Sequence, residues 1–287
     1  MPDLWRPAEV DLPTPDAVAS YREHGWYVTD PIVPLDLLDR VRTLVDEHQR
    51  RPARGRLSPD VGMQDWSPID GGGLRNNEFI TVQEPRFAEL TLLPVVGAIA
   101  ARLAGTTSVR LFDDQALAKP PGDDAAFVGW HADRAYWTNC SSRQMLTAWI
   151  PFEDSTIENG TLMVVDGSHH WDGVEHLRHF HDPNLDRLAA VTDGRVPDDA
   201  VTSLVLRKGQ VSFHHEGLLH ASRPNRSGGT RLALAVHLQP ADNEFRQTFT
   251  PTGEPVLLPA DRLCRRTVDG RPDYSDPVVF PTIWPAA

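Results

Sequence analysis

The chain has 287 residues, 40% of them hydrophobic, and its 28 Lys and Arg against 40 Asp and Glu give a formal net charge of -12. This length suffices for one large core, and a β barrel with flanking helices commonly reaches this size as one domain. The acidic balance, without a basic run, excludes nucleic acid and anionic membrane surfaces as expected partners.

The first hundred residues predict helices. Residues 15–23 and 34–49 are expected to be helical, and the second helix has a one-sided apolar stripe made by Leu37, Leu38, Val41, Leu44 and Val45. Residues 51–77 are rich in Arg, Pro, Gly and Asp and predict a long loop near a site. A further helical segment is expected over residues 85–103, with a break near Pro94.

From Ser108 onward the sequence changes to short apolar or alternating runs separated by turn residues. Eight strands are expected, at residues 108–118, 125–131, 144–152, 161–166, 202–206, 210–214, 217–222 and 231–238. Helices followed by many short strands favour a double-sheet jelly roll over parallel βαβ units.

The predicted organisation is a single domain. It comprises a helical part (1–105), a jelly-roll core (106–240) and a C-terminal extension (241–287) that is Pro-rich and expected to wrap the core in an extended form. The polar insert 168–199 is long enough to form a lid over the mouth of the barrel.

Three side chains suggest a metal site. His131 and Asp133 are two residues apart, so they share one face of a strand and can hold one ion from the end of that strand. His220, from a later strand, can supply the third ligand. Two imidazoles and one carboxylate form the ligand face that holds non-haem Fe(II) and leaves positions open for a co-substrate and O2.

Arg231 lies eleven residues beyond His220, across a run of turn formers. We expect a hairpin centred between Asn225 and Arg226, which would make His220 and Arg231 cross-strand neighbours with Cβ atoms about 5 Å apart. Ser222 would share their face. The returning strand alternates small residues on the face of Arg231 (Ala233, Ala235) with large ones on the other (Leu232, Leu234, Val236). A guanidinium beside a hydroxyl, over small side chains, suits one end of a dicarboxylate.

The remaining histidines have simpler interpretations. His176, His179 and His181 have ligand-like spacing but lie in a polar segment, where solvated side chains are expected. His24 and His48 are expected on helix surfaces. The pair His214 and His215 stays open between a strand end, a support for the ligands and a substrate contact.

Several motifs in order resemble the phytanoyl-CoA dioxygenase family of Fe(II)/2-oxoglutarate-dependent oxygenases. They are Trp130-His131-Ala132-Asp133, Leu146-Thr147-Ala148-Trp149-Ile150-Pro151, Glu158-Asn159-Gly160-Thr161-Leu162, Gly167-Ser168-His169 and His220-Ala221-Ser222 through Arg231. The likeness runs from about Gln115 to His237. It implies a double-stranded β-helix, which agrees with the jelly roll expected from the strand pattern.

The resemblance also implies roles for individual residues. His131, Asp133 and His220 would be the iron ligands, and Arg231 with Ser222 would bind the far carboxylate of 2-oxoglutarate. Further co-substrate contacts would come from Trp149, Gln115 and Thr81. The expected cofactors are therefore Fe(II), 2-oxoglutarate and O2. Oxidative decarboxylation to succinate and CO2 would drive oxidation of a C–H bond.

The substrate side is less defined by the sequence. The aromatic residues proposed as its walls are Trp66, Phe79, Trp137 and Phe213. Halogenases of this chemistry lack a carboxylate at the position of Asp133, so hydroxylation, desaturation, epimerisation or ring formation remain open. A small molecule, as in bacterial natural-product biosynthesis, is the expected substrate. The Arg-rich residues 50–56 could meet an anionic carrier or CoA but are better explained as a solvated loop.

Two other classes of protein remain open at this stage. A cupin-like hydrolase or isomerase could place Zn or Mn on the same three ligands, although Arg231 would then have no obvious role. A non-catalytic binding protein on a jelly-roll scaffold would not need the three ligands. With no secretory signal and only Cys140 and Cys264, we expect a cytoplasmic protein, either monomer or homodimer.

Overall fold

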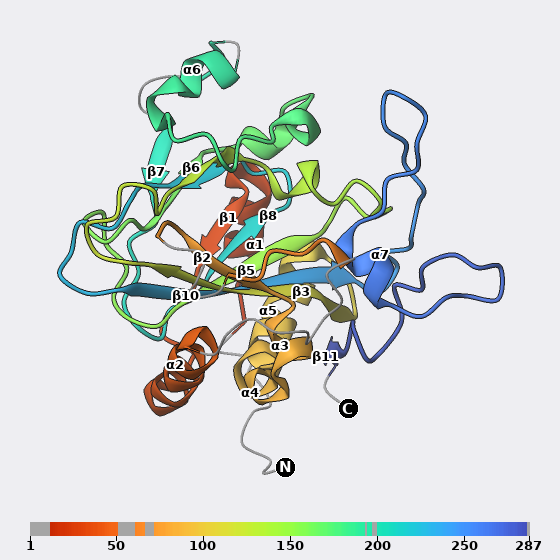
Figure 1. Ribbon diagram of the computed structural model, residues 1–287, viewed down its shortest axis with the longest axis horizontal. Coiled ribbons are helices and arrows are strands. Elements are labelled where there is room, and N and C mark those ends of the chain that lie inside the picture. The colour runs from red at the N-terminus through yellow and green to blue at the C-terminus, as the bar shows by residue number, and fades with distance from the viewer. Residues whose placement is uncertain (1–11, 51–60, 67–71, 193, 197–199, 286–287) are drawn as a thin grey trace.

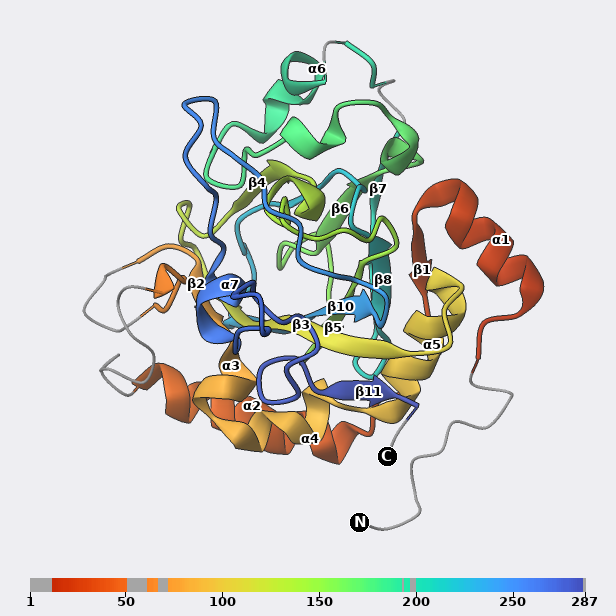
Figure 2. The same ribbon diagram turned by 90° about the vertical axis from the view of Figure 1, so that its right-hand side faces the viewer.

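The computed structural model describes residues 12–50, 61–66, 72–192, 194–196 and 200–285. Two antiparallel sheets face one another, and helices cover the outer face of the larger sheet (Figures 1 and 2). This arrangement confirms the expected double-sheet jelly roll with N-terminal helices.

The helices in the N-terminal part form where the sequence predicts them. Helix α1 (Pro15–His24) begins where the Thr14 side chain accepts a hydrogen bond from the Ala17 amide and ends at Gly25, whose φ of 83° favours glycine. The others are α2 (Leu35–Arg50), α3 (Ile80–Gln83), the 3-10 turn Pro85–Phe87, α4 (Ala88–Thr91) and α5 (Pro94–Ala104). The break expected near Pro94 falls between α4 and α5 because proline favours the first turn of a new helix.

The larger sheet has seven strands. They are β1 (Trp26–Val28), β2 (Arg75–Glu78), β3 (Val109–Lys119), β5 (Leu146–Pro151), β8 (Ser212–His215), β10 (Arg231–Pro240) and β11 (Thr282–Trp284). Their order is β1-β8-β5-β10-β3-β11, and β2 pairs with the end of β3 that β11 leaves free.

The smaller sheet has the order β4-β9-β6-β7, made by β4 (Val128–His131), β9 (His220–Ser222), β6 (Leu162–Val165) and β7 (Val201–Ser203). All eight predicted strands are therefore present. The sequence analysis missed β1, β2 and β11, which are three or four residues long. Short helices and 3-10 turns complete the described elements: Asp133–Ala135, Ser168–His170, Val174–His176, Leu185–Arg187, α6 (Leu188–Val191) and α7 (Pro259–Leu263).

The main core lies between the helices and the outer face of the larger sheet, and β10 shows how its alternation divides the two faces. Leu232, Leu234 and Val236 are buried in this core, as expected from the large face of the strand. Ala233 and Ala235 face the space between the sheets. The apolar stripe of α2 packs in the same core. Among the described residues no single helix is long and apolar enough to cross a membrane.

The predicted hairpin between His220 and Arg231 is wrong. Strand β9 pairs with β4 and β6, whereas β10 pairs with β3 and β5 in the other sheet. The turn formers do reverse the chain, but they carry it from one sheet to the other. Asn225 fixes this link, because its amide donates to the carbonyls of Lys119 and Gly229. His220 and Arg231 therefore face each other across the interior instead of along one sheet.

Three smaller expectations also need correction. The predicted loop 51–77 ends in strand β2, while its residues 51–60 and 67–71, with most of the Arg-rich segment, lie outside the described residues. The C-terminal extension is not only an extended wrap, because it contributes α7 and adds β11 to the sheet. His48 is buried and meets the ring of Phe87 edge-on, instead of lying on the surface.

Candidate metal centre and cavity

The three residues singled out as ligands converge at one end of the smaller sheet. His131 ends β4 and is the register partner of His220 on β9, while Asp133 begins the 3-10 turn that follows. The candidate ligand atoms lie within 4.8 Å of one another. Each histidine Nε2 is 3.6 Å from Asp133 Oδ1.

Backbone carbonyls fix the protonation of both imidazoles. His131 Nδ1 lies 2.9 Å from the carbonyl oxygen of Gly129, and His220 Nδ1 lies 2.8 Å from that of Leu218. Since a carbonyl only accepts, each Nδ1 carries the hydrogen and each Nε2 presents its lone pair to the centre. Burial lowers the pKa of both histidines, which keeps them neutral.

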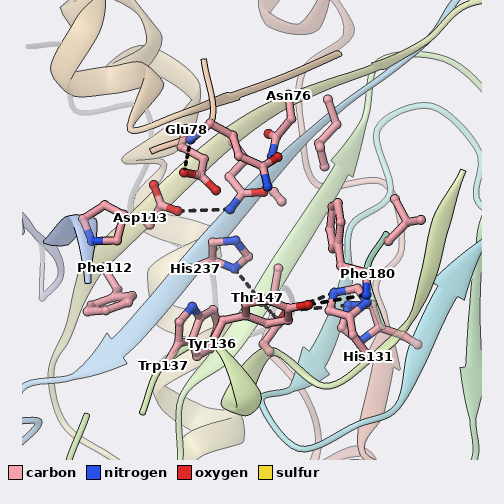
Figure 3. A pocket seen from close by; sticks show the side chains of 18 of the residues that line it. Asn76, Glu78, Phe112, Asp113, His131, Tyr136, Trp137, Thr147, Phe180 and His237 are labelled. Carbon is pink, nitrogen blue, oxygen red and sulfur yellow. Dashed lines mark hydrogen bonds and ion pairs between the residues drawn. The ribbon is translucent and has the colours of Figure 1, made fainter. Parts of the chain in front are cut away.

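Asp133 is held as a carboxylate. Burial alone would raise its pKa, but the neighbouring His220 and the other imidazoles hold that pKa well below its usual range. The Thr147 hydroxyl donates to Asp133 Oδ2 over 2.7 Å and accepts from His237 Nδ1 over 2.8 Å (Figure 3). Two neutral imidazoles and one ionised carboxylate are the donor set that a divalent transition metal requires, so these residues fit a ferrous ion.

Gly129 allows the polar insert to lie directly on β4. A Cβ at this position would come within 1.9 Å of the His179 carbonyl oxygen. The amide of Gly129 instead donates to the Phe180 carbonyl. This approach brings the ring of Phe180 edge-on to His131, with centroids 5.0 Å apart. Within the insert, Arg178, Phe180 and His181 thus lie over the candidate ligands and line the adjoining cavity.

A cavity of about 400 Å³ opens beside the three ligands, between the two sheets. Of the residues proposed from the sequence, those that line it are His131, Asp133, His220, Gln115, Trp149, Ser222, Arg231, Phe79 and Trp137. Further walls come from Arg178, Phe180 and His181 of the insert and from residues 256–260 of the C-terminal extension. Although the hairpin is wrong, the facing of two sheets brings the same side chains together.

Arg231 places a buried guanidinium in the wall of the cavity. Its side chain is buried, and one terminal nitrogen donates to the Gly160 carbonyl over 3.1 Å, but Nε has no partner among the described residues. The guanidinium carbon lies 5.3 Å from the centre of the Trp149 ring. Burial lowers the pKa of Arg231 to about 10, so it stays cationic at neutral pH. An unpaired buried donor on a cation fits the carboxylate of a bound acid.

Lys119, the register partner of Arg231, was missed by the sequence analysis. It is fully buried, and its Nζ donates to the Ser222 hydroxyl (2.5 Å) and to the carbonyls of Ser222 (3.0 Å) and Arg223 (2.7 Å). These bonds tie β9 to β3 across the barrel. They also orient the Ser222 hydroxyl so that its own hydrogen is available to a ligand. The available signal was a lysine directly after the apolar run Ala116-Leu117-Ala118.

Three of the proposed pocket residues lie elsewhere. The Thr81 hydroxyl binds Asp114 and Thr91 outside the cavity lining. Phe213 is buried in the core beneath the helices, because strand alternation turns His214 inward and Phe213 outward. Trp66 does not line the cavity either, and the guanidinium of Arg75 stacks on its ring.

The histidines left open are now placed. His214 lines the cavity with Nε2 3.3 Å from Asp133 Oδ2, so it supports the centre. His215 points away and contacts the Arg143 carbonyl. His176 and His181 are exposed, and His181 lies at the cavity mouth. The half-buried Glu78 and the buried Asp113, which also line the cavity, were not foreseen.

Comparison with known proteins agrees with this geometry. The model of the phytanoyl-CoA dioxygenase family matches residues 21–233. The chain belongs to the phytanoyl-CoA dioxygenase family. It is 24% identical over 269 residues to the peroxisomal phytanoyl-CoA dioxygenase of Mus musculus, covering 91% of this chain and 79% of that protein. It is 23% identical over 261 residues to dioxygenase olcK of Penicillium canescens, covering 88% and 78%.

Solved structures of similar fold include two 2-oxoglutarate-related proteins. The α-ketoglutarate-dependent carbocyclase SnoK from nogalamycin biosynthesis has a TM-score of 0.70 at 24% identity, covering 96% of this chain and 99% of SnoK. EctD from S. alaskensis, solved with 2-oxoglutarate and 5-hydroxyectoine, has a TM-score of 0.70 at 20% identity, covering 94% and 89%. These structures confirm the fold, and the family match makes the chain an Fe(II)/2-oxoglutarate-dependent dioxygenase.

Proposed function

We propose that this enzyme uses Fe(II), 2-oxoglutarate and O2 to oxidise a C–H bond of a small molecule, releasing succinate and CO2. One observation carries the proposal. A ligand set of two neutral imidazoles and a carboxylate shares its cavity with a buried guanidinium whose Nε lacks a partner. A keto diacid such as 2-oxoglutarate can bind the metal with its keto acid end and the guanidinium with its far carboxylate, so it needs both groups in one cavity.

Each residue has a defined task in the proposal. His131, Asp133 and His220 hold the ferrous ion, and Arg231 pairs with the far carboxylate of 2-oxoglutarate. Ser222, oriented by Lys119, donates its hydroxyl hydrogen to the same carboxylate. Trp149 packs beneath the guanidinium, and Gln115 lines the adjacent wall.

When bound, iron and 2-oxoglutarate supply the oxidising power together with O2. The chain contributes the positions of the reactants and the exclusion of water. Phe180 closes one side of His131 through the insert, and Trp137 stands against His237 with ring centroids 4.9 Å apart. These rings would exclude solvent from the side of the cavity where the substrate is oxidised.

The setting we propose is bacterial secondary metabolism in the cytoplasm. Support for a role in secondary metabolism comes from the similar fold of SnoK, a carbocyclase from nogalamycin biosynthesis. Support for the cytoplasm comes from the two free, buried cysteines, which suit a reducing compartment that also preserves Fe(II). The retained carboxylate of Asp133 favours hydroxylation, desaturation, epimerisation or cyclisation over halogenation.

The test is turnover of 2-oxoglutarate by the purified chain. The protein is loaded with Fe(II) and 2-oxoglutarate without oxygen, then exposed to air, and succinate is measured. Asp133→Ala and His220→Ala should reduce succinate formation by at least about 100-fold, because loss of a residue that only orients a metal ligand already costs about 10- to 100-fold. His176→Ala, which changes an exposed histidine of the insert, is the matched control.

Two results would reject the proposal. One is succinate formation that persists in both ligand variants. The other is activity on small-molecule substrates without O2 and with Zn or Mn in place of iron, which would support the cupin-like hydrolase or isomerase. In that enzyme Arg231→Met would leave activity unchanged, since a hydrolase has no diacid to bind.

A further inference from the structure

One side of the cavity is made of hydrogen-bond acceptors. Asn76 and Glu78 are two residues apart on β2 and therefore share a face, and Asp113 comes from the adjacent strand β3. Figure 3 shows the carboxyl groups of Glu78 and Asp113 beside one another, with His237 between them and His131. This acidic side is separate from the metal ligands and from Arg231.

The two carboxyl groups are only partly satisfied by the protein. Asp113 accepts from the Phe79 amide (2.9 Å) and the Gln115 side-chain amide (3.1 Å), and Glu78 accepts from the Gln64 amide (2.7 Å). Within the described residues neither carboxyl group forms an ion pair with a lysine or an arginine. The described part of the chain therefore places acceptors here without pairing them with a cation.

Asn76 gives an independent sign that a donor is missing. Its side-chain nitrogen donates to Gln64 Oε1 over 2.9 Å, but its Oδ1 has no partner among the described residues, although Asn76 is only 4% exposed. Buried polar atoms are almost always hydrogen-bonded, so an unpaired acceptor in a cavity wall indicates a ligand with a donor. In Figure 3 the Asn76 side chain points toward the cavity.

The electrostatics of the pair agree with this geometry. Burial raises the pKa of Glu78 to about 7, and burial together with the nearby Glu78 raises the pKa of Asp113 well above its usual value. With a pKa of about 7, the Glu78 carboxyl group is about half ionised at neutral pH, so the pair keeps a partial negative charge. A cation with several N–H donors complements both the charge and the acceptors.

We propose that the substrate carries a cationic nitrogen, a primary or secondary ammonium group, that binds Glu78, Asp113 and Asn76. This inference rests on the proposed function, because the bound ammonium compound is a substrate only if the protein is an oxygenase. The aromatic rings of Phe79, Phe112 and Trp137 also line the cavity and would contact the rest of the molecule and the cation. The ammonium group then anchors one end of the substrate, and the bond to be oxidised faces the iron.

Titration calorimetry with two probes of equal size tests this inference. Benzylamine, which is protonated at pH 7.5, and neutral benzyl alcohol are each added to the full chain, first alone and then loaded with Zn(II) and 2-oxoglutarate. Benzylamine should bind at least about tenfold more tightly than benzyl alcohol in both states, as expected for charge-assisted hydrogen bonds. The measurement needs no turnover, so it stands apart from succinate formation as the test of the proposed function.

Variants locate the preference. Glu78→Gln and Asp113→Asn should each reduce the ratio of the two affinities to about threefold or less, whereas Glu158→Gln, which removes the same charge from an exposed site, should leave it unchanged. Equal binding of both probes by the unaltered protein would overturn the inference. So would a preference that disappears when Zn(II) is loaded, because the amine would then have been bound by Asp133.

Discussion

Replacing Lys119 by methionine probes the support of the co-substrate site. Methionine fills a similar volume, so the change removes three hydrogen bonds without creating a large void. Two backbone carbonyls and the Ser222 hydroxyl lose their buried donor, at about 1–3 kcal/mol each. Part of this cost is offset, because the methionine variant no longer has to bury a polar amine. We expect Lys119→Met to lower the free energy of unfolding by about 2–4 kcal/mol.

The pH dependence gives a second signature. Burial, and then Arg231, lower the pKa of Lys119 well below 10.5. The unfolded chain therefore keeps this proton to higher pH than the folded chain does, so Lys119 makes the wild-type protein more stable as pH rises toward 10.5. The slope from this group is at most about 1.4 kcal/mol per pH unit, and Lys119→Met should lack it.

Urea unfolding at several pH values between 7 and 9.5 measures both effects. Lys208→Met is the matched control, because Lys208 forms an ion pair with the exposed Asp39 and should contribute less than about 1 kcal/mol. If Lys119→Met unfolds within about 0.5 kcal/mol of the wild type at every pH, the reasoning from buried acceptors is refuted.

Three other predictions follow from the cavity. Arg231→Met should weaken 2-oxoglutarate binding by roughly 30- to 1000-fold, the scale of about 2–4 kcal/mol for a lost charge partner, and an unchanged KM for 2-oxoglutarate would exclude this anchor. Thr147→Val breaks the link from His237 to Asp133 and should weaken Fe(II) binding by about 10- to 100-fold in a competitive chelator titration, whereas unchanged affinity would show that the link does not orient the carboxylate. Burial raises the pKa of Glu78 from 4.5 to about 7, so the wild type loses stability as pH rises through this range. Glu78→Gln should therefore gain up to about 3 kcal/mol over the wild type in urea unfolding at pH 8 but little at pH 4.5, and an equal difference at both values would contradict this.

Strand alternation made much of the site predictable. Because side chains alternate between the two faces of an extended chain, His131 and Asp133 were expected on the same face. The same rule placed Ala233 and Ala235 on the face opposite the large residues of β10. Both inferences depend only on local geometry. Strand pairing was different. The same turn residues can close a hairpin or carry the chain to a second sheet, and only long-range packing decides between them.

The residues that were missed share a physical reason. Lys119 and Asp113 are charged residues of β3, and Glu78 ends the short strand β2. The roles of all three depend on which groups face them in the folded protein. No spacing in the sequence encodes such a neighbour. Phe213 was wrongly predicted to line the cavity. A shift of one position along a strand decides whether an aromatic ring points into the cavity or into the core.

Three groups of residues that are far apart in the sequence help to line the cavity: residues 62, 64, 74, 76 and 78, residues 178, 180 and 181, and residues 256–260. None of them supplies a candidate ligand, since those come from β4, the turn after it, and β9. The selection of the molecule to be oxidised is thus separable from the oxidation itself. An exchange of Val256–Ala260 with the matching segment of a relative should retarget the enzyme while its uncoupled consumption of co-substrate stays the same. Members of such a family can therefore change their substrate through substitutions in these cavity-lining segments while the candidate metal ligands stay the same.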